Sequence, residues 1–470
     1  MQERKCESGK QNNAEISTLD VPDTLIVGGE YPDFFEGRMK QANIGISDGK
    51  IAYIGEERPE AREIIDATGK IVSPGFIDIH MHEENFAKEG KKFCVSRMML
   101  EMGVTTAVGG NCGTMYQPLA EFKSIIHELG GSPVNYIMLA GYNQYRTQLG
   151  IGRYEHASQK QMDELADIMR RELAEGAYGI SFGIEYDPGI TFDEMLYALR
   201  ITDDPHLLVS AHFRCETRKD DLFSVEEMIR LAGEIPQKFQ ISHISSCSAT
   251  GSMREALACI NAAMEKNPRL NYDTYPYNAF STEIGSAVFA DGALEGWGKD
   301  YCDVLLTDEP YKNVYCTKEI FEDARANYPK MLAVAAVMNE DEITAAIVNK
   351  NGMVASDAII NGGSGHPRAA GTFPRLLGKY VRQERALPML DALRKITLEP
   401  AQRLELDQKG RIELGCDADI TIFDPETIID KADFTQLRPP EGIETVLIAG
   451  HRALTAGQIT NPHAGKFISR

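Results

Sequence analysis

Segments with strand propensity alternate with amphipathic segments through the middle of this 470-residue chain, and this alternation constrains the fold most strongly. Helices are expected between the strands, among them residues 159–174, 222–234 and 253–265, the first with Ser158 as N-cap and Gly176 beyond its end. Short runs rich in β-branched and aromatic residues predict eight strands, at residues 76–80, 105–108, 136–140, 179–183, 207–212, 239–243, 270–274 and 353–357.

Eight strand and helix units in succession predict an α/β fold, a (β/α)8 TIM barrel at residues 73–407. A doubly wound open sheet alternates in the same way, so the count of strands alone leaves that alternative open. Residues 281–351 are too long for one crossover connection. We expect them to hold an inserted lid or subdomain before the eighth strand.

The two ends of the chain show a different pattern, in which short β-rich runs are separated by glycine and aspartate. An Asp48-Gly49 pair between two such runs is a hairpin signal, and similar runs return near the C-terminus. We therefore expect a small β-sandwich domain formed from both termini, by residues 21–72 and 408–470. Residues 1–20 are polar and are expected to form a disordered tail.

Composition argues against several classes of function. With 49 Lys and Arg against 70 Asp and Glu, the formal charge is −21, which disfavours a nucleic-acid or membrane-surface partner. The longest apolar run, residues 331–338, is too short to span a bilayer. The nine cysteines are odd in number and sparse, and the N-terminal residues lack a signal-peptide core. These features predict a reducing, cytoplasmic location.

Side chains that can bind metal ions fall at the carboxyl ends of the predicted strands. Four of the ten histidines stand there, together with one cysteine and one aspartate. In a barrel these strand ends converge on one mouth, so the side chains are expected to meet. Imidazole, thiolate and carboxylate groups together suit Zn²⁺. The six residues are His80, His82, Cys112, His212, His243 and Asp357.

Each of these residues taken alone has an ordinary structural interpretation. Cys112 alone is more often a small buried apolar residue than a ligand, and Asp357 alone can simply begin a turn. His80 and His82 lie on one face of a strand, where such pairs are often only satisfied polar groups. A metal site is favoured because all six residues occur at matching strand ends.

Several motifs resemble those of the amidohydrolase superfamily. The two histidines at 80 and 82 follow a PGFID motif at residues 74–78, and a GxDADI motif occupies residues 415–420. The resemblance extends from about residue 25 to the end of the chain. It narrows to the N-acyl-D-amino-acid deacylases, also called D-aminoacylases, through GNCG at 110–113, YPY at 275–277, HPR at 366–368 and GTFPR at 371–375.

This resemblance implies a zinc-dependent hydrolase that cleaves the amide bond of N-acyl-D-amino acids to a carboxylate and a free D-amino acid. The cysteine replaces the carboxylated lysine that bridges two metals in hydantoinases and dihydroorotases, and the predicted fourth strand has no lysine. The resemblance also implies one tight zinc site and a second, weaker one. The tight site would use Cys112, His212 and His243, with His80 and His82 helping to form the other.

Catalysis at such a site needs a nucleophile, a proton carrier and a substrate anchor. Zinc lowers the pKa of bound water to about 7, so metal-bound hydroxide is the expected nucleophile. Asp357 is the expected general base and acid, which takes the water proton and returns it to the leaving amine. Arg368 carries the planar fork that suits an α-carboxylate, unless it is a surface arginine paired with an acidic residue. The resemblance adds Tyr186, Tyr275 and Ser281 as hydrogen-bonding partners of the substrate.

The roles of two positions, Glu185 and Ser245, and two alternative functions stay open. Glu185, just past the fourth strand, is a weaker candidate ligand. Relatives often carry lysine where this chain has Ser245, which argues against a preference for D-glutamate or D-aspartate. An amidohydrolase acting on cyclic amides, as hydantoinases and dihydroorotases do, or on other N-acyl compounds is the main alternative. A non-catalytic barrel scaffold is disfavoured because every expected ligand position is filled.

Overall fold

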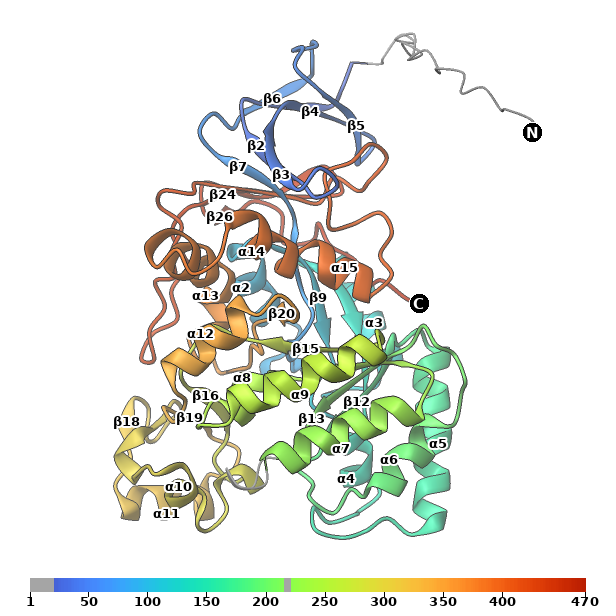
Figure 1. Ribbon diagram of the computed structural model, residues 1–470, viewed down its shortest axis with the longest axis vertical. Helices are drawn as coiled ribbons and strands as arrows, with labels where there is room; N and C mark the ends of the chain where they lie inside the picture. The colour runs from blue at the N-terminus through green and yellow to red at the C-terminus, as the bar shows by residue number, and fades with distance from the viewer. Residues whose placement is uncertain (1–20, 215–220) are drawn as a thin grey trace, which may run out of the picture.

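The structure, a computed structural model, describes residues 21–214 and 221–470 (Figure 1). The predicted tail at residues 1–20 lies outside the described residues. The described chain combines an α/β part with two mixed, mainly antiparallel sheets at one end of the molecule (Figure 1). In the described residues, no helix has the length and apolar character needed to cross a membrane.

Parallel strands of the α/β part follow one another in space in the order of the chain. One sheet contains β8 (Phe76–Asp78), β9 (Val104–Gly109) and β10 (Asn135–Met138). The next sheet has the order β11 (Ala140–Gly141), β12 (Gly179–Gly183), β13 (Leu208–His212), β14 (Lys238–Ile241), β15 (Leu270–Thr274) and β20 (Met353–Val354).

The first and last strands of this succession are neighbours. Only Leu139 separates β10 from β11, so these two strands form one extended segment. A parallel bridge between Met81 and Ala358 joins the chain just past β8 to the chain just past β20. The backbone N–H of Asp357 also donates to the carbonyl of His80 at 2.7 Å. The carboxyl ends of β8 and β20 are therefore held side by side.

The strands predicted from the sequence are all present, with ends that shift by a few residues. The largest difference is at the eighth, predicted at residues 353–357, because β20 ends at Val354. Its last predicted residue, Asp357, has a φ of 50°, which a regular strand does not allow. The polypeptide leaves the sheet after Val354 and turns beside the chain that follows β8.

The predicted helix at residues 159–174 is confirmed as α5 (Gln159–Ala174), with Ser158 as N-cap in a capping box with Gln161. The segments predicted at 222–234 and 253–265 form α7 (Asp221–Glu234) and α9 (Met253–Lys266), which pack against β14 and β15. The other helices of the α/β part are α1 (Phe86–Glu89), α2 (Val95–Glu101), α3 (Leu119–Glu128), α4 (Tyr142–Gln148), α6 (Phe192–Leu199), α8 (Ile244–Ser248), α12 (Glu340–Val348), α13 (Arg368–Arg375), α14 (Met389–Ile396) and α15 (Leu398–Arg403), with a π-helical segment η3 (Leu376–Gln383).

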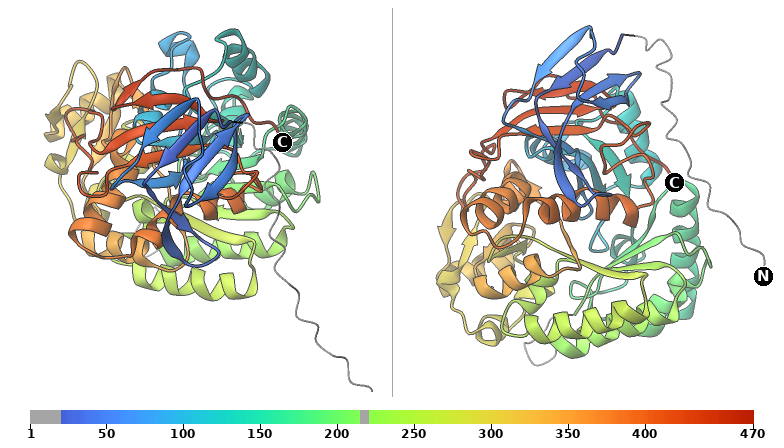
Figure 2. Two further views of the ribbon diagram at one scale, coloured as in Figure 1. Left: turned by 90° about the horizontal axis from the view of Figure 1, so that it is seen from above. Right: turned by 45° about the horizontal axis from the view of Figure 1, so that its top comes forward.

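Strands from both ends of the chain share one seven-stranded sheet, as the blue and red strands of Figure 2 show. Its order is β26 (Gln458–Ile459), β25 (His451–Thr455), β24 (Ile443–Ile448), β23 (Ile420–Phe423), β7 (Ile71–Pro74), β2 (Glu30–Asp33) and β3 (Arg38–Gln41). A four-stranded sheet has the order β5 (Lys50–Gly55), β4 (Asn43–Ser47), β1 (Thr24–Val27) and β6 (Glu63–Asp66). Buried side chains of both sheets form one core, among them Ile26, Ile44, Val72 and Ile420.

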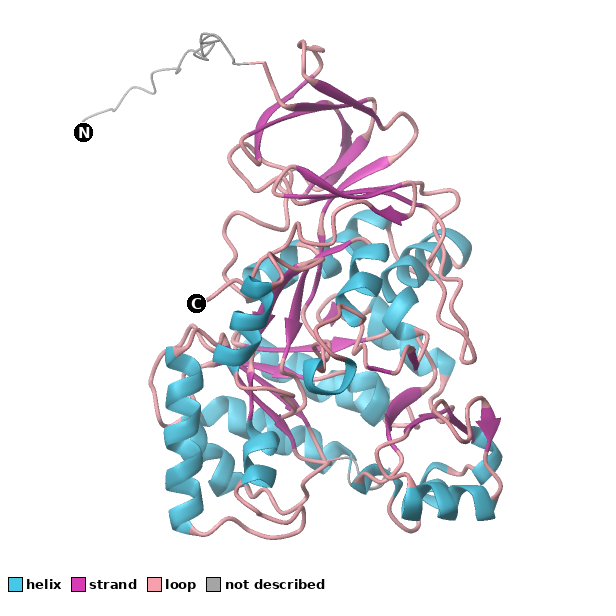
Figure 3. Ribbon diagram, turned by 180° about the vertical axis from the view of Figure 1, so that it is seen from behind, coloured by secondary structure: helices cyan, strands magenta, loops and turns pink. Residues whose placement is uncertain are grey.

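A separate antiparallel sheet lies between β15 and β20 in the chain (Figure 3, lower right). It has the order β16 (Phe280–Glu283), β19 (Leu332–Ala335), β17 (Val304–Leu306) and β18 (Val314–Tyr315). Its short helices are η1 (Ala287–Phe289), α10 (Ala293–Trp297), η2 (Tyr301–Asp303) and α11 (Lys318–Asn327), and a small hairpin β21 (Ile360–Asn361) and β22 (Ser364–Gly365) follows β20.

Lys395 in α14 holds the segment that leads into β20. Its buried ammonium donates to the carbonyls of Asn349, Asn351 and Gly352, at 2.6, 3.1 and 2.9 Å. We expect Lys395→Met to lower the free energy of unfolding by about 2–3 kcal/mol, because three carbonyls lose a charged donor. Urea denaturation measures this change. Lys160→Met on the exposed face of α5 is the matched control, and equal midpoints for the two variants would contradict the expectation.

Candidate metal centre

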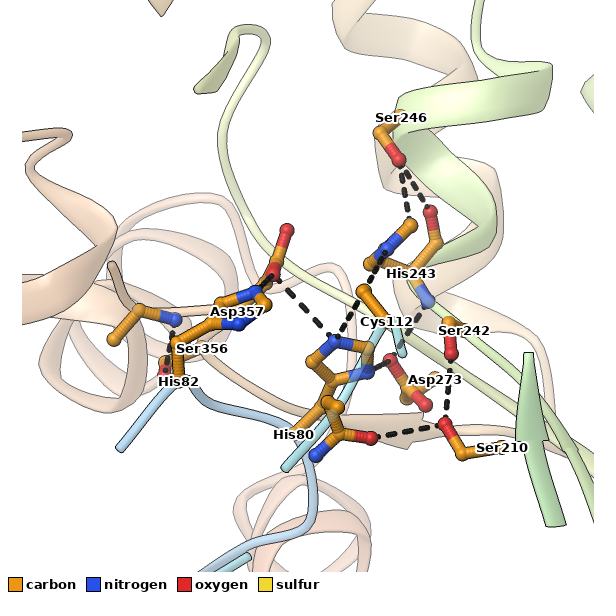
Figure 4. A network of polar contacts seen from close by, with 12 residues as sticks. His80, His82, Cys112, Ser210, Ser242, His243, Ser246, Asp273, Ser356 and Asp357 are labelled. Carbon is orange, nitrogen blue, oxygen red and sulfur yellow. Dashed lines mark hydrogen bonds and ion pairs between the residues drawn. The ribbon is translucent and has the colours of Figure 1, made fainter. Parts of the chain in front are cut away.

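Cys112 lies at the centre of the predicted ligands, which meet at the carboxyl ends of the strands (Figure 4). Its Sγ is 3.3 Å from Nε2 of His80 and 3.3 Å from Nε2 of His243. Ligands bound at 2.0–2.3 Å around a tetrahedral ion lie about 3.5 Å apart, so these separations suit zinc. The donor atoms form two buried sets within 4.8 Å that share the cysteine: His80, His82, Cys112 and Asp357, and Cys112, His212 and His243.

Three of these residues have a left-handed backbone that is uncommon outside glycine. Cys112, His243 and Asp357 have φ values of 53°, 30° and 50°. Such conformations cost about 1–3 kcal/mol each and persist where the surroundings impose them, typically at functional sites. Nothing in the local sequence signals this strain, because it arises where the chain turns just beyond a strand end.

Two further polar residues orient the histidines, and neither was predicted from the sequence. Asp273 at the end of β15 accepts a hydrogen bond from the backbone N–H of His243 at 2.8 Å and lies 3.4 Å from Nδ1 of His80. Ser246 Oγ lies 2.7 Å from Nδ1 of His243. These contacts leave Nε2 of both rings facing Cys112. Asp273 is the next-to-last residue of a predicted strand, near the strand ends that carry the six candidate residues, and that position was a signal that could have found it.

The charges of the site balance one another in the buried interior. Burial alone would raise the pKa of the Cys112 thiol, but the charges of His80 and His243 hold it well below its usual range. Burial alone would also raise the pKa of the Asp357 carboxyl, but the charge of the nearby Arg368 guanidinium holds that pKa well below its usual range. The site therefore presents a thiolate and a carboxylate, which are the ionised forms that bind metal.

Arg368 lies next to Asp357 in the interior rather than at the surface. One guanidinium nitrogen is 2.9 Å from Oδ2 of Asp357, and the other donates to the carbonyl of Ser281 at 3.1 Å. The guanidinium also stacks over the Tyr275 ring at 4.7 Å. Only 1% of Arg368 is exposed, so the alternative of a surface arginine is excluded.

A pocket opens beside the ligands. Tyr186, Ser281 and Asp357 contribute polar groups to its lining, while Phe280, Val288 and Trp297 contribute an apolar side. These three apolar residues come from the segment between β15 and β20, here called the insertion. Among the described residues, the hydroxyl groups of Ser281 and Tyr275 are buried without a hydrogen-bond partner. The predicted substrate-binding residues thus lie around the site, with Tyr275 and Arg368 next to Asp357.

Comparison with known proteins agrees with this geometry. Two family models, each described as Amidohydrolase family, match residues 71–234 and 320–453. The D-aminoacylase of Alcaligenes xylosoxydans xylosoxydans is 28% identical, with 95% of this chain and 98% of that protein covered. The chain belongs to the amidohydrolase family.

Two solved deacylase structures are similar to this amidohydrolase. The N-acyl-D-glutamate deacylase of Bordetella bronchiseptica, complexed with zinc and a phosphonate inhibitor, matches with a TM-score of 0.84 at 26% identity, covering 96% of this chain and 100% of the other. A crystal structure of D-aminoacylase matches with a TM-score of 0.85 at 26% identity, covering 95% and 100%. Both likenesses span nearly the whole amidohydrolase chain.

We expect Cys112→Ala in this amidohydrolase to abolish stoichiometric metal binding, because both sets of donor atoms share this thiolate. Elemental analysis of protein dialysed against a weak chelator measures the effect. Cys316→Ala is the matched control, since Cys316 is a buried cysteine of the insertion whose thiol pKa is raised to about 12 by burial. Full metal content in Cys112→Ala would show that the cysteine is not a ligand.

Proposed function

We propose that this amidohydrolase is a zinc-dependent hydrolase that cleaves N-acyl-D-amino acids to a carboxylate and a free D-amino acid. One observation carries the proposal: two sets of metal donors share a buried thiolate beside an aspartate paired with a buried arginine. The relatives named above support the linear amide and the D configuration. The substrate is thus a small molecule.

We interpret the succession of parallel strands, joined by the Met81–Ala358 bridge, as a (β/α)8 TIM barrel. In this interpretation the barrel comprises residues 73–407 with an insertion around 281–351, and residues 21–72 and 408–470 form a β-sandwich domain. A cytoplasmic location is also proposed. It is supported by the described cysteines, which no disulfide joins.

We assign the tight zinc site to Cys112, His212 and His243, and a weaker second site to His80 and His82 with the shared cysteine. The separations of the donor atoms and the ionised thiolate support this assignment. When bound there, zinc would supply Lewis-acid activation of water and of the amide carbonyl.

Asp357 is assigned the proton transfers of the reaction. Its Oδ1 lies 3.3 Å from Nε2 of His82 and its Oδ2 is held by Arg368, so one oxygen faces the metal ligands. The carboxylate is ionised because the Arg368 charge keeps its pKa low. It can therefore accept the proton of the attacking water and return it to the amine nitrogen, which leaves only after protonation.

Arg368, Tyr186, Tyr275 and Ser281 are assigned to the substrate. The unpartnered hydroxyls of Tyr275 and Ser281 are free to donate hydrogen bonds to the substrate's carboxylate, and the Arg368 guanidinium lies beside both residues. The positive charge of Arg368 is already paired with the Asp357 carboxylate. A substrate carboxylate would therefore share the Arg368 guanidinium with Asp357 rather than neutralise an unpaired arginine.

The pocket supports substrates with apolar side chains. Phe280, Val288 and Trp297 offer an apolar surface, and the Glu185 carboxylate in the same lining would repel an acidic side chain. Position 245, where relatives often have lysine, is a buried serine that offers no positive charge. N-acyl-D-amino acids such as the phenylalanine and leucine derivatives therefore fit better than N-acyl-D-glutamate.

A substrate panel tests the proposed function directly. We expect zinc-loaded protein to hydrolyse N-acetyl-D-phenylalanine and N-acetyl-D-leucine faster than their L enantiomers or N-acetyl-D-glutamate. The expected difference in kcat/KM is at least about tenfold, because an unmatched charge or a misplaced side chain costs more than about 1.4 kcal/mol. Release of free amino acid is measured. Hydantoin and dihydroorotate serve as cyclic-amide controls, and preferential cleavage of these or of the L series would refute the assignment.

Asp357→Asn separates proton transfer from metal binding. We expect kcat to fall by about 100- to 10,000-fold, because the amide cannot accept the proton of the attacking water. Zinc content, measured by elemental analysis on the same sample, should stay at the wild-type level. Loss of zinc together with activity would instead show that Asp357 acts mainly as a ligand.

A further inference from the structure

Glu185 makes a short contact with His212 that the proposed chemistry does not use. Its Oε2 lies 2.6 Å from Nε2 of His212, and both side chains are buried at the edge of the pocket. A carboxylate only accepts, so Nε2 carries a proton, and Nδ1 is the ring nitrogen left to bind a metal ion. Nδ1 of His212 is buried and has no hydrogen-bond partner among the described residues.

We propose that Glu185 is a positioning residue, which fixes the tautomer and ring orientation of His212 so that Nδ1 is presented to zinc. This inference rests on the proposed zinc site. A carboxylate behind a metal-binding histidine orients the ring and makes it a stronger ligand, and its loss typically lowers metal affinity about 10- to 100-fold.

The geometry distinguishes this role from direct ligation. Glu185, His212 and Cys247 also form a group whose donor atoms lie within 4.8 Å, which could suggest a cation site of their own. The 2.6 Å separation of Oε2 and Nε2 is that of a charge-assisted hydrogen bond, whereas two ligands of one zinc ion lie about 3.4 Å apart. The contact therefore orients the His212 ring, and the two groups do not bind one ion together.

The fold places Glu185 firmly. It follows β12 by two residues, and the backbone N–H of Ile184 donates to the carbonyl of His212 at 2.8 Å. Gly183 lets the same turn lie close to Cys112, because a Cβ there would lie 2.2 Å from the carbonyl oxygen of Cys112. The turn that carries Glu185 thus lies against the backbone of two of the assigned zinc ligands.

The other histidines have weaker outer partners. Nδ1 of His243 faces the neutral Ser246 hydroxyl at 2.7 Å, and Nδ1 of His80 lies 3.4 Å from Asp273. Within the described part of the site, Glu185 is the carboxylate that approaches a histidine ring most closely. We therefore expect His212 to be the ligand whose strength depends most on its outer partner.

The test measures zinc affinity rather than activity. Holoenzyme is titrated with a competing chelator, and the visible absorption of the cobalt-substituted protein reports the ligand field. We expect Glu185→Ala to weaken zinc binding about 10- to 100-fold and to shift the cobalt bands. Glu185→Gln, which keeps an acceptor oxygen at the same reach, should recover part of the loss.

Asp187→Asn is the matched control. Asp187 lies in the same turn, but its carboxylate accepts a hydrogen bond from Asn143 at 2.9 Å and touches no assigned ligand. Wild-type zinc affinity and cobalt bands in Glu185→Ala would overturn the inference, as would an equal loss in Asp187→Asn. Wild-type protein that retains no zinc would instead overturn the proposed function, so the two failures are distinguishable.

Discussion

Cys112 belongs to both sets of donor atoms, and a thiolate buried at that point requires positive charge around it. An uncompensated charge in a protein interior costs several kcal/mol. Without metal, the pKa of His80 is raised well above its ordinary value against the effect of burial, by the charges of Cys112 and Asp273. A metal cation would replace these protons, so binding and proton release are coupled at this centre.

The position of each proposed ligand along its strand could be predicted from sequence, because it depends on local pattern alone. His212 is the last residue of β13, and His80 and His243 lie two residues past the ends of β8 and β14. Parallel strands ordered along the chain bring such ends to one edge without any detailed knowledge of packing. This is why residues separated by more than a hundred positions could be expected to lie together, as their donor atoms do.

The contacts that orient those ligands could not be predicted in the same way. Pairing of Arg368 with Asp357 depends on the path of the chain through the small hairpin that follows β20, where the sequence offers glycines and little pattern. The positive φ of Cys112 and Asp357 depends equally on neighbouring strand ends. Sequence periodicity describes regular elements, whereas these features arise where elements stop and long-range contacts decide the conformation.

Chemistry and selectivity come from different parts of the chain. The metal donors stand at strand ends that pair with one another, so any shift of one strand disturbs the others. Phe280, Val288 and Trp297 belong to the insertion, whose sheet pairs only within itself among the described strands. The insertion can therefore change its side chains without moving the metal donors, because loops and inserted segments tolerate variation that paired strands do not.

Glu185 lies where the two parts meet, as a residue of the strand-end turn that both touches His212 and lines the pocket. A substitution there would alter metal binding and side-chain preference together, which ties selectivity at this one position to the strength of the metal centre.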